Sequence, residues 1–281
     1  MVSARQLYEA LTAQLNAAGI PDAAFDVRCM LEQMAERPFP QLMLSDSLTQ
    51  EQADKLCEMA EERQKGHPLQ YLLGEWEFYG LRMFVGEGVL IPRPDTETLV
   101  DAALEFCKTL RNPQIADLCS GSGCIPIALK ANLPQAHVHA VEWSEQALGY
   151  LRRNAAYHNS DVEIHHADVL DERFARQFSG LDLIVSNPPY LTAQDMQNLQ
   201  TEVQFEPEMA LLGGEDGLHF YREITKIWKH SLKNGGMLAF EVGIGQSQAV
   251  RKILEEHQFT DIRIIPDLAG VERVAAGRKI F

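Results

Sequence analysis

The chain has 281 residues, and its net charge of −15 and sequence pI near 5.0 make it acidic. Hydrophobic residues make up 46% and charged residues 23%, a balance typical of an ordinary globular protein that is long enough for two domains. No apolar run approaches the roughly 20 residues that span a bilayer, no basic-then-apolar leader is present, and no basic stripe suggests binding to duplex phosphates.

Residues 1–75 have the pattern of a small all-helical domain. Leucines recur at four-residue spacing from Leu7 to Leu15, which is typical of one face of a helix. A later helical stretch opens with Thr49 and Gln52, which are spaced for a capping box. Nothing in this part suggests chemistry, so we expect a domain that docks a partner.

Residues 76–91 alternate aromatic and apolar side chains with glycines. Gly86-Glu87-Gly88 is a turn signal, and we therefore expect a β-hairpin that links two domains. The following Pro92 to Asp95 should start a helix that runs to about Leu110.

From Gln114 the pattern alternates strands and helices, which predicts an α/β domain over residues 92–281 with a mostly parallel, seven-stranded sheet. Its ligand crevice should lie at the carboxyl ends of the strands. The last two strands should pair as an edge hairpin. The expected strands are 115–118, 138–142, 162–165, 181–185, 237–241, 261–265 and 271–279.

The first of these strands runs into the small residues 119–123, which allow a ligand to approach the backbone closely. Such a loop serves NAD, FAD, nucleotides or S-adenosylmethionine, and a plain tight turn is the alternative. It lacks the P-loop ending and the third glycine of the dinucleotide fingerprint. About twenty residues on, Glu142 could accept hydrogen bonds from both ribose hydroxyls, or it could simply precede a helix capped by Ser144.

The sequence Asn187-Pro188-Pro189-Tyr190 follows the fourth strand. The prolines fix φ and lack amide donors, so carbonyls can face a ligand. The Asn187 side-chain oxygen and the Pro188 carbonyl could accept both hydrogens of a planar –NH₂ group, against which Tyr190 could stack. Acceptors placed off the amide plane would favour the pyramidal nitrogen of a methyl-transfer transition state. A rigid loop without chemistry is the alternative.

These motifs resemble those of amino-group methyltransferases of the Rossmann-like class I fold. More narrowly, the chain is similar to the PrmC/HemK family. The resemblance is carried by Pro68-Leu69-Gln70-Tyr71, by the run from Val89 to Glu97, by Phe205-Glu206-Pro207, and by Asp267 to Gly270 followed by Arg273. It implies S-adenosylmethionine-dependent methylation of the glutamine in the Gly-Gly-Gln motif of bacterial class I peptide-chain release factors, with a helical N-terminal domain that helps to hold the release factor.

The resemblance also implies roles for individual residues. They are Cys119, Ser120, Gly121, Ser122 and Gly123 on the methionine and ribose side of the cofactor, Glu142 at the ribose, Asp168 and Val169 at the adenine, and Asn187, Pro188, Pro189 and Tyr190 at the glutamine amide. The chain departs from the common pattern at three of them. Cys119 replaces a frequent glycine, Glu142 a frequent aspartate and Val169 a frequent aromatic residue. Cys119 implies that its backbone position does not need a positive φ.

Several alternatives stay open at this point. The target could be a glutamine of a ribosomal protein or the N6 of a nucleic-acid adenine, and a binding module that kept the fold without catalysis is a third possibility. Arg93, Asp95 and Glu97 could touch ligand or only start a helix, and by resemblance Glu206 supports the Asn-Pro-Pro-Tyr loop.

We expect no metal, because the adjacent His165 and His166 point to opposite faces of a strand. We read Cys119 and Cys124 as packing residues. The five cysteines form no C-x-x-C pair, and their odd count favours reduced thiols in a cytoplasmic protein. From the lack of a long apolar run and of a basic stripe we expect neither a membrane nor a nucleic-acid partner.

Overall fold

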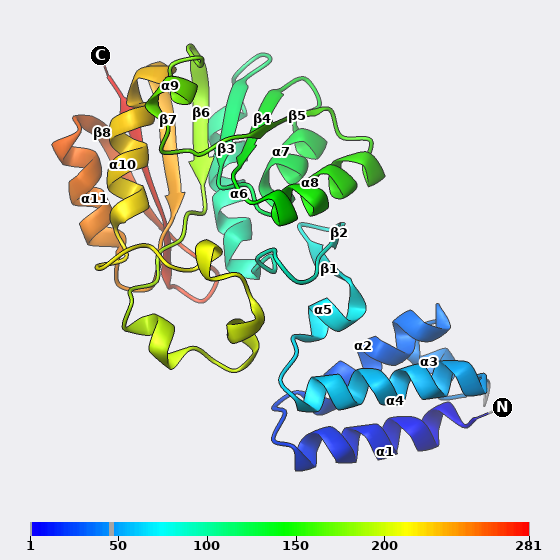
Figure 1. The fold of residues 1–281 in the computed structure, drawn as a ribbon. Helices are drawn as coiled ribbons and strands as arrows, with labels where there is room; N and C mark the ends of the chain where they lie inside the picture. The colour runs from blue at the N-terminus through cyan, green and yellow to red at the C-terminus, as the bar shows by residue number, and fades with distance from the viewer. Residues whose placement is uncertain (1, 45–47, 281) are drawn as a thin grey trace. The chain divides into compact units, whose positions relative to one another are not determined.

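The computed structural model describes residues 2–44 and 48–280. The chain divides into two compact units (Figure 1). The first extends to Glu75 and also contains Gln200–Phe205, and the second consists of Trp76–Leu199 and the part of the chain from Glu206 onward. Membership of Gln200–Phe205 in the first unit has no signal in the sequence, because it depends on contacts between residues far apart in the chain.

The first unit is helical. Its long helices pack around fully buried side chains that include Leu15, Met30 and Leu56. The predicted capping box is confirmed: the Gln52 amide donates to Thr49 Oγ1 at 3.2 Å, and the Thr49 amide donates to Gln52 Oε1 at 2.9 Å. The helices are α1 (Ala4–Ala17), α2 (Ala23–Ala35), α3 (Phe39–Leu42), α4 (Gln50–Gln64) and α5 (Leu69–Leu73).

A buried ion cluster ties Gln200–Phe205 to these helices. Arg63 Nε lies 2.7 Å from Asp26 Oδ2, and both side chains are only 5% exposed. Arg63 Nη2 lies 2.5 Å from Glu202 Oε1, so one guanidinium binds two carboxylates. The His67 and Phe205 rings stack with centroids 4.1 Å apart.

The second unit contains a seven-stranded sheet with the order β5-β4-β3-β6-β7-β9-β8. Only β9 runs antiparallel to its neighbours, so the predicted mostly parallel sheet with a terminal edge hairpin is confirmed. The strands are β3 (Gln114–Leu118), β4 (His137–Glu142), β5 (Val162–His166), β6 (Leu181–Ser186), β7 (Leu232–Glu241), β8 (Phe259–Pro266) and β9 (Glu272–Lys279).

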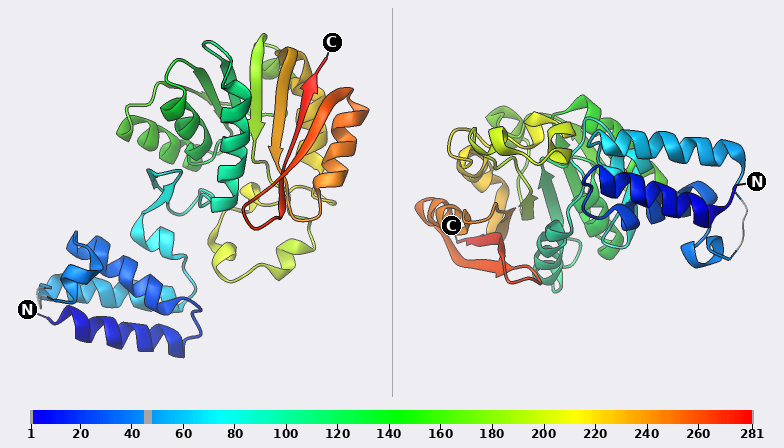
Figure 2. Two further views of the ribbon diagram at one scale, coloured as in Figure 1. Left: turned by 180° about the vertical axis from the view of Figure 1, so that it is seen from behind. Right: turned by 90° about the horizontal axis from the view of Figure 1, so that it is seen from below.

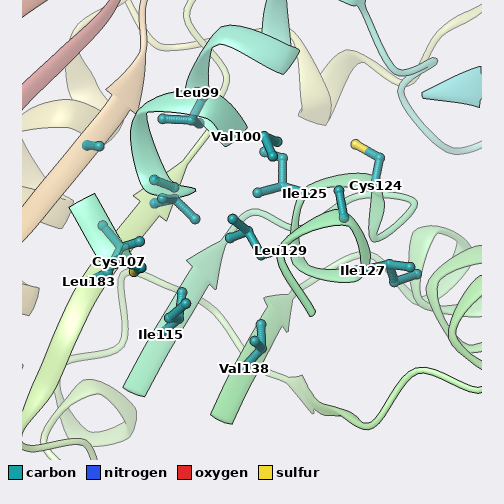
Figure 3. Packing of buried hydrophobic residues seen from close by; sticks show 14 of the residues in the cluster. Leu99, Val100, Cys107, Ile115, Cys124, Ile125, Ile127, Leu129, Val138 and Leu183 are labelled. Atoms are coloured by element: carbon teal, nitrogen blue, oxygen red, sulfur yellow. The ribbon is translucent and has the colours of Figure 1, made fainter. Parts of the chain in front are cut away.

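Helices cover both faces of this sheet. Figure 1 shows α10 (His219–Trp228) in front of it, and Figure 2, left, shows α6 (Glu97–Cys107) in front of the opposite face. The core under α6 and α7 (Cys124–Asn132) is drawn in Figure 3, where Leu129 of α7 lies between Ile125 and Ile115 of β3. The remaining helices are α8 (Glu145–Tyr157), α9 (Glu172–Ala175) and α11 (Ser247–Glu256). Among the described residues, no helix combines the length and apolarity needed to cross a membrane.

A two-stranded hairpin precedes this domain, as predicted, with β1 (Glu75–Phe78) and β2 (Leu81–Phe84). Its turn is Tyr79–Gly80, where both residues have positive φ, 53° and 71°. This backbone matches the right-handed twist of the strands. A turn does form at the predicted Gly86–Gly88, where Val89 N donates to the Gly86 carbonyl at 3.3 Å, but it follows β2 and does not join the two strands of the hairpin.

Candidate functional site

A cavity of about 220 Å³ opens where β3, β4, β5 and β6 end. Parallel strands bring their carboxyl ends to one edge of the sheet, so the segments that follow them converge there. The lining residues come from these segments and from the stretches around positions 88–90, 207–210 and 220. Seven of the predicted site residues line it: Cys119, Gly121, Glu142, Asp168, Val169, Asn187 and Pro189.

A smaller neighbouring cavity of about 30 Å³ brings in two more predicted residues, Ser120 and Ser122, beside Cys119, Gly121 and Asn187. Gly123, Pro188 and Tyr190 line neither cavity. Gly123 nevertheless has a requirement of its own. Its φ is +84°, and a Cβ there would lie 2.3 Å from Leu151 Cδ1, so only glycine fits between the loop and α8.

Cys119 has a φ of +63°. The expectation that this position does not need a positive φ is therefore wrong. A left-handed backbone costs a residue with a Cβ on the order of 1–2 kcal/mol, a cost that glycine avoids. The chain must turn here because the next amide, that of Ser120, donates to the Val141 carbonyl of the neighbouring strand at 3.1 Å.

Glu142 is held by three backbone amides. Its Oε2 accepts from Gly121 N at 2.7 Å, and its Oε1 accepts from Trp143 N at 2.8 Å and Ser144 N at 2.7 Å. The carboxylate thus fixes the glycine loop against the end of β4. The alternative interpretation also holds in part, because Ser144 caps α8 by accepting from Ala147 N at 3.3 Å.

We expect Glu142→Ala to weaken binding of S-adenosylmethionine about 100-fold. The change removes the acceptor for three amides and, in the role that the resemblance implies, for the ribose hydroxyls; hydrogen bonds to a charged group contribute roughly 1.5–3 kcal/mol. Isothermal titration calorimetry measures this affinity directly. Glu145→Ala is the matched control, because that carboxylate is mostly exposed one turn away. A Glu142→Ala affinity equal to the control's would contradict the assignment.

The part of the cavity that the resemblance assigns to the adenine carries Asp168, Val169 and the exposed indole of Trp143. Asp168 Oδ1 accepts from Leu170 N at 2.8 Å, and the Val169 carbonyl accepts from Trp228 Nε1 at 2.8 Å. These bonds hold the loop after β5 in place. Trp143 presents an aromatic face to the same cavity as Val169, and no motif in the sequence indicated that it would.

Asn187 begins the loop after β6, and its Nδ2 donates to Thr96 Oγ1 at 3.3 Å. The buried Glu241 carboxyl at the end of β7 lies on the same side. Burial raises the pKa of Glu241 to about 7, while hydrogen bonds from Thr96 and Asn187 oppose the rise in its pKa. Because the amide –NH₂ of Asn187 is used in this way, its Oδ1 is left to accept a hydrogen from a ligand in the cavity.

Two glycines let another part of the backbone lie very close to the rest of the Asn-Pro-Pro-Tyr segment. A Cβ at Gly213 would lie 2.6 Å from the Pro189 oxygen, and one at Gly217 would lie 2.3 Å from the Tyr190 oxygen. Gln246 Nε2 donates to the same Tyr190 oxygen at 2.9 Å. Burial raises the pKa of Tyr190 to about 12, so its phenol stays neutral.

The four residues with open roles all make protein contacts in the second unit. Arg93 Nη2 binds Glu206 Oε1, and Glu206 Oε2 accepts from Ile91 N at 3.1 Å. Asp95 pairs with Arg273 at 2.7 Å, and the Glu97 carboxylate accepts from Tyr79 N at 2.8 Å. Arg93 also lines the smaller cavity.

Asp117, at the end of β3, is a functional candidate that the sequence analysis missed. It is fully buried, and neither of its carboxylate oxygens has a hydrogen-bond partner within residues 2–44 and 48–280. Burial raises the pKa of Asp117 to about 8. A buried, unpaired carboxyl with a raised pKa is typical of functional sites. The signal in the sequence was an acid directly before this loop.

The raised pKa of Asp117 predicts a stability that depends on pH. Between about pH 4 and pH 8 the folded state keeps a proton that the unfolded state has released, so the free energy of unfolding falls as pH rises. One proton contributes about 1.4 kcal/mol per pH unit, or about 2–3 kcal/mol from pH 5 to 7. Without cofactor, the free energy of urea unfolding should fall about 2–3 kcal/mol less from pH 5 to 7 in Asp117→Asn than in the wild type. Parallel curves for the two proteins would contradict it.

Two further features were missed. Gly88, Val89 and Leu90 line the cavity, although the sequence placed them in a hairpin. The fully buried Asn154 of α8 donates to the Phe84 and Ser122 carbonyls at 3.0 and 2.9 Å, which connects the hairpin to the glycine loop. An asparagine inside a helix gives no sequence signal for such distant partners.

Comparison with known proteins agrees with this geometry. Residues 6–74 match the family described as PrmC N-terminal domain, and residues 96–211 match the Methyltransferase small domain. Among solved structures, the hMettl16 catalytic domain in complex with a MAT2A 3'UTR hairpin has a TM-score of 0.58 at 16% identity, with 84% of each chain covered. The T. thermophilus 16S rRNA N2 G1207 methyltransferase, in complex with AdoMet and guanosine, has a TM-score of 0.51 at 17% identity over 73% of this chain and 49% of its own. These similarities show the class I methyltransferase fold.

Curated relatives are much more similar in sequence. The release factor glutamine methyltransferase of Thermodesulfovibrio yellowstonii is 40% identical over 81% of this chain and 82% of its own length. Its namesake in Neisseria gonorrhoeae is 36% identical over 90% and 92%, and that in Koribacter versatilis is 34% identical over 98% of both chains. The chain is a methyltransferase, and it belongs to the release factor glutamine methyltransferase family.

Proposed function

We propose that this enzyme transfers a methyl group from S-adenosylmethionine to the side-chain nitrogen of the glutamine in the Gly-Gly-Gln motif of class I peptide-chain release factors. The observation that carries the proposal is the orientation of Asn187. Its –NH₂ group faces Thr96 and Glu241, and its Oδ1 remains as an acceptor for the –NH₂ of a substrate amide.

S-Adenosylmethionine supplies an electrophilic methyl group. We assign Glu142 to the ribose, Asp168, Val169 and Trp143 to the adenine, and the loop after β3 to the methionine moiety. A cofactor cation close to Asp117 would lower the raised pKa of this carboxyl and so favour its charged form. The Glu142 and Asp168 carboxylates in the lining suit a cofactor that carries a sulfonium charge. A cavity walled mainly by apolar side chains also keeps water from the reactive methyl group.

The protein's part in the reaction is to position the amide nitrogen and to favour its pyramidal form. The lone pair of a planar amide is delocalised into the carbonyl, so the nitrogen is a poor nucleophile. We propose that Asn187 Oδ1 and the Pro188 carbonyl accept its two hydrogens. These two oxygens then stabilise the positive charge that develops on the nitrogen. Alignment of nitrogen and methyl can contribute roughly 7–11 kcal/mol. The proton leaves afterwards, so no strong base is needed.

The first unit is proposed as the docking domain for the release factor. Its match to the PrmC N-terminal domain supports this role. A release-factor substrate implies a cytoplasmic enzyme.

The test is methyl transfer from labelled S-adenosylmethionine to three substrates in parallel. Unmodified release factor should be labelled, whereas ribosomal protein and adenine-containing DNA and RNA should not. If ribosomal protein alone is labelled, the enzyme remains a glutamine methyltransferase in this account, but its substrate is a ribosomal protein and not release factor. Labelling of nucleic acid alone would overturn the proposal in favour of adenine. A release factor with its Gly-Gly-Gln glutamine changed to alanine is the matched control and should stay unlabelled.

A further inference from the structure

Three potential metal ligands meet on the two strands at one edge of the sheet. His139 lies on β4, and Glu163 and His165 lie on the edge strand β5. The parallel register places Glu163 opposite His139 and His165 opposite Val141. Residues two apart on a strand face the same side, so the three side chains project from one face of the sheet. None of them lines the methyl-transfer cavity.

Their separations fit a single ion. His139 Nδ1 lies 3.1 Å from His165 Nε2. An ion bound at the usual zinc–nitrogen distance of about 2.0–2.1 Å would see these two nitrogens at an angle of about 100°, close to the tetrahedral value. The Glu163 carboxylate presents Oε2 to His139 Nδ1 at 3.2 Å and Oε1 to His165 Nε2 at 3.6 Å, so it closes the third side.

The surroundings favour metal binding over a charged histidine pair. The two imidazoles are 18% and 20% exposed, and the Phe178 ring lies edge-on to both, with centroids 5.3 and 5.4 Å away. Burial lowers the pKa of both histidines, the Glu163 charge opposes this, and His137 lowers the pKa of His139 further. Neutral imidazole is the form that binds a metal. Glu163 is 66% exposed, so the fourth position faces solvent.

We propose that His139, Glu163 and His165 form a binding site for a borderline divalent transition metal, with zinc as the best match. Two imidazoles and a carboxylate are ligands that Zn²⁺ accepts in tetrahedral sites, with water in the remaining position. Such an ion would link the edge strand β5 to β4. Its ligand His139 lies three residues before Glu142, and its ligand His165 lies three residues before Asp168.

The pair of histidines that adjoin in sequence does not form this site. His166 points to the other face of β5, where it binds the Trp143 carbonyl at 3.1 Å and lies 3.2 Å from Glu145 Oε2. His165 and His166 therefore cannot share an ion, as predicted, but the expectation of no metal considered this pair alone. The second imidazole comes from the neighbouring strand, 26 residues away in sequence.

The experiment is a zinc titration of the full-length, metal-free protein against a chromophoric chelator. The test variants are His139→Ala, His165→Ala and Glu163→Gln. His166→Ala is the matched control, since it also removes an imidazole beside a glutamate on β5. We expect the wild type to bind one zinc ion. Each histidine test variant should weaken it by more than the roughly 10- to 100-fold that loss of an outer-shell partner costs, and His166→Ala should not.

Cobalt substitution identifies the ligands. Bound Co²⁺ should show visible absorption of a tetrahedral nitrogen and oxygen site without a thiolate charge-transfer band, and circular dichroism should show that the variants remain folded. The proposal is overturned if the wild type binds no zinc, which would leave the imidazoles merely hydrogen-bonded to each other. The proposal is also overturned if His166→Ala weakens zinc binding as much as the test variants do, or if the test variants bind zinc as the wild type does. A thiolate band would place the ion on cysteines and overturn it as well.

Discussion

Asn187→Ala is expected to lower kcat for methyl transfer about 1000-fold, while the affinity for S-adenosylmethionine changes only a few-fold. The variant loses the acceptor that is engaged most strongly when the substrate nitrogen becomes pyramidal and positive, and removal of one such preorganised group typically costs 10²–10³ in kcat. Single-turnover kinetics, with the enzyme and S-adenosylmethionine in excess over release factor, would measure the chemical step without product release.

Asn198→Ala is the matched control for this variant. Asn198 is an exposed asparagine in the same connection between β6 and α10, and its side chain only donates to the Gln194 carbonyl. Its turnover should equal that of the wild type. If Asn187→Ala retained more than about a tenth of wild-type turnover, the role of Asn187 Oδ1 as the key acceptor would be refuted, since loss of such a group costs at least about 100-fold.

Arg63→Ala is expected to destabilise the first unit by about 3–5 kcal/mol. The guanidinium is the buried partner of Asp26, whose pKa is raised by burial and lowered again by Arg63, so removing it leaves a carboxylate without its counter-ion. Glu202 loses its partner as well, which releases the Gln200–Phe205 segment. Hydrogen exchange measured by mass spectrometry on peptides from α2 and α4 would report this unit separately.

The tryptophans provide an internal reference for the same experiment. Trp76, Trp143 and Trp228 all lie in the second unit, so their fluorescence follows that unit alone. Arg28→Ala is the control, because Arg28 pairs with Glu32 on an exposed surface where ion pairs contribute at most about 1 kcal/mol. Equal protection of the α2 and α4 peptides in Arg63→Ala and in the control would show that the buried cluster does not stabilise the unit.

The sequence patterns correctly predicted the features that depend on interactions between residues close together in the chain. The capping box at Thr49 and Gln52, the strand before Asn187 and the mostly parallel sheet depend on neighbouring residues or on regular alternation. The hairpin was predicted correctly, but its turn was not: Gly86 and Gly88 gave a stronger turn signal than Tyr79–Gly80, where a tyrosine adopts a positive φ.

What the sequence could not provide depends on long-range contacts. The positive φ of Cys119 follows from the hydrogen bond between Ser120 and the next strand, and the environment of Asp117 follows from helices packed over it. The attachment of Gln200–Phe205 to the first unit requires Arg63 and Glu202 to meet across 139 positions. Likewise, the orientation of Asn187 depends on Glu241, whose position in space no motif indicates.

The measurement that tests the central claim most directly is tandem mass spectrometry of the Gly-Gly-Gln peptide from release factor incubated with the enzyme and S-adenosylmethionine. The account predicts a gain of one methyl group, with fragment ions that place it on the glutamine side chain, and no gain with Asn187→Ala. A methyl group on any other residue, or an unmodified glutamine despite cofactor binding, would contradict it.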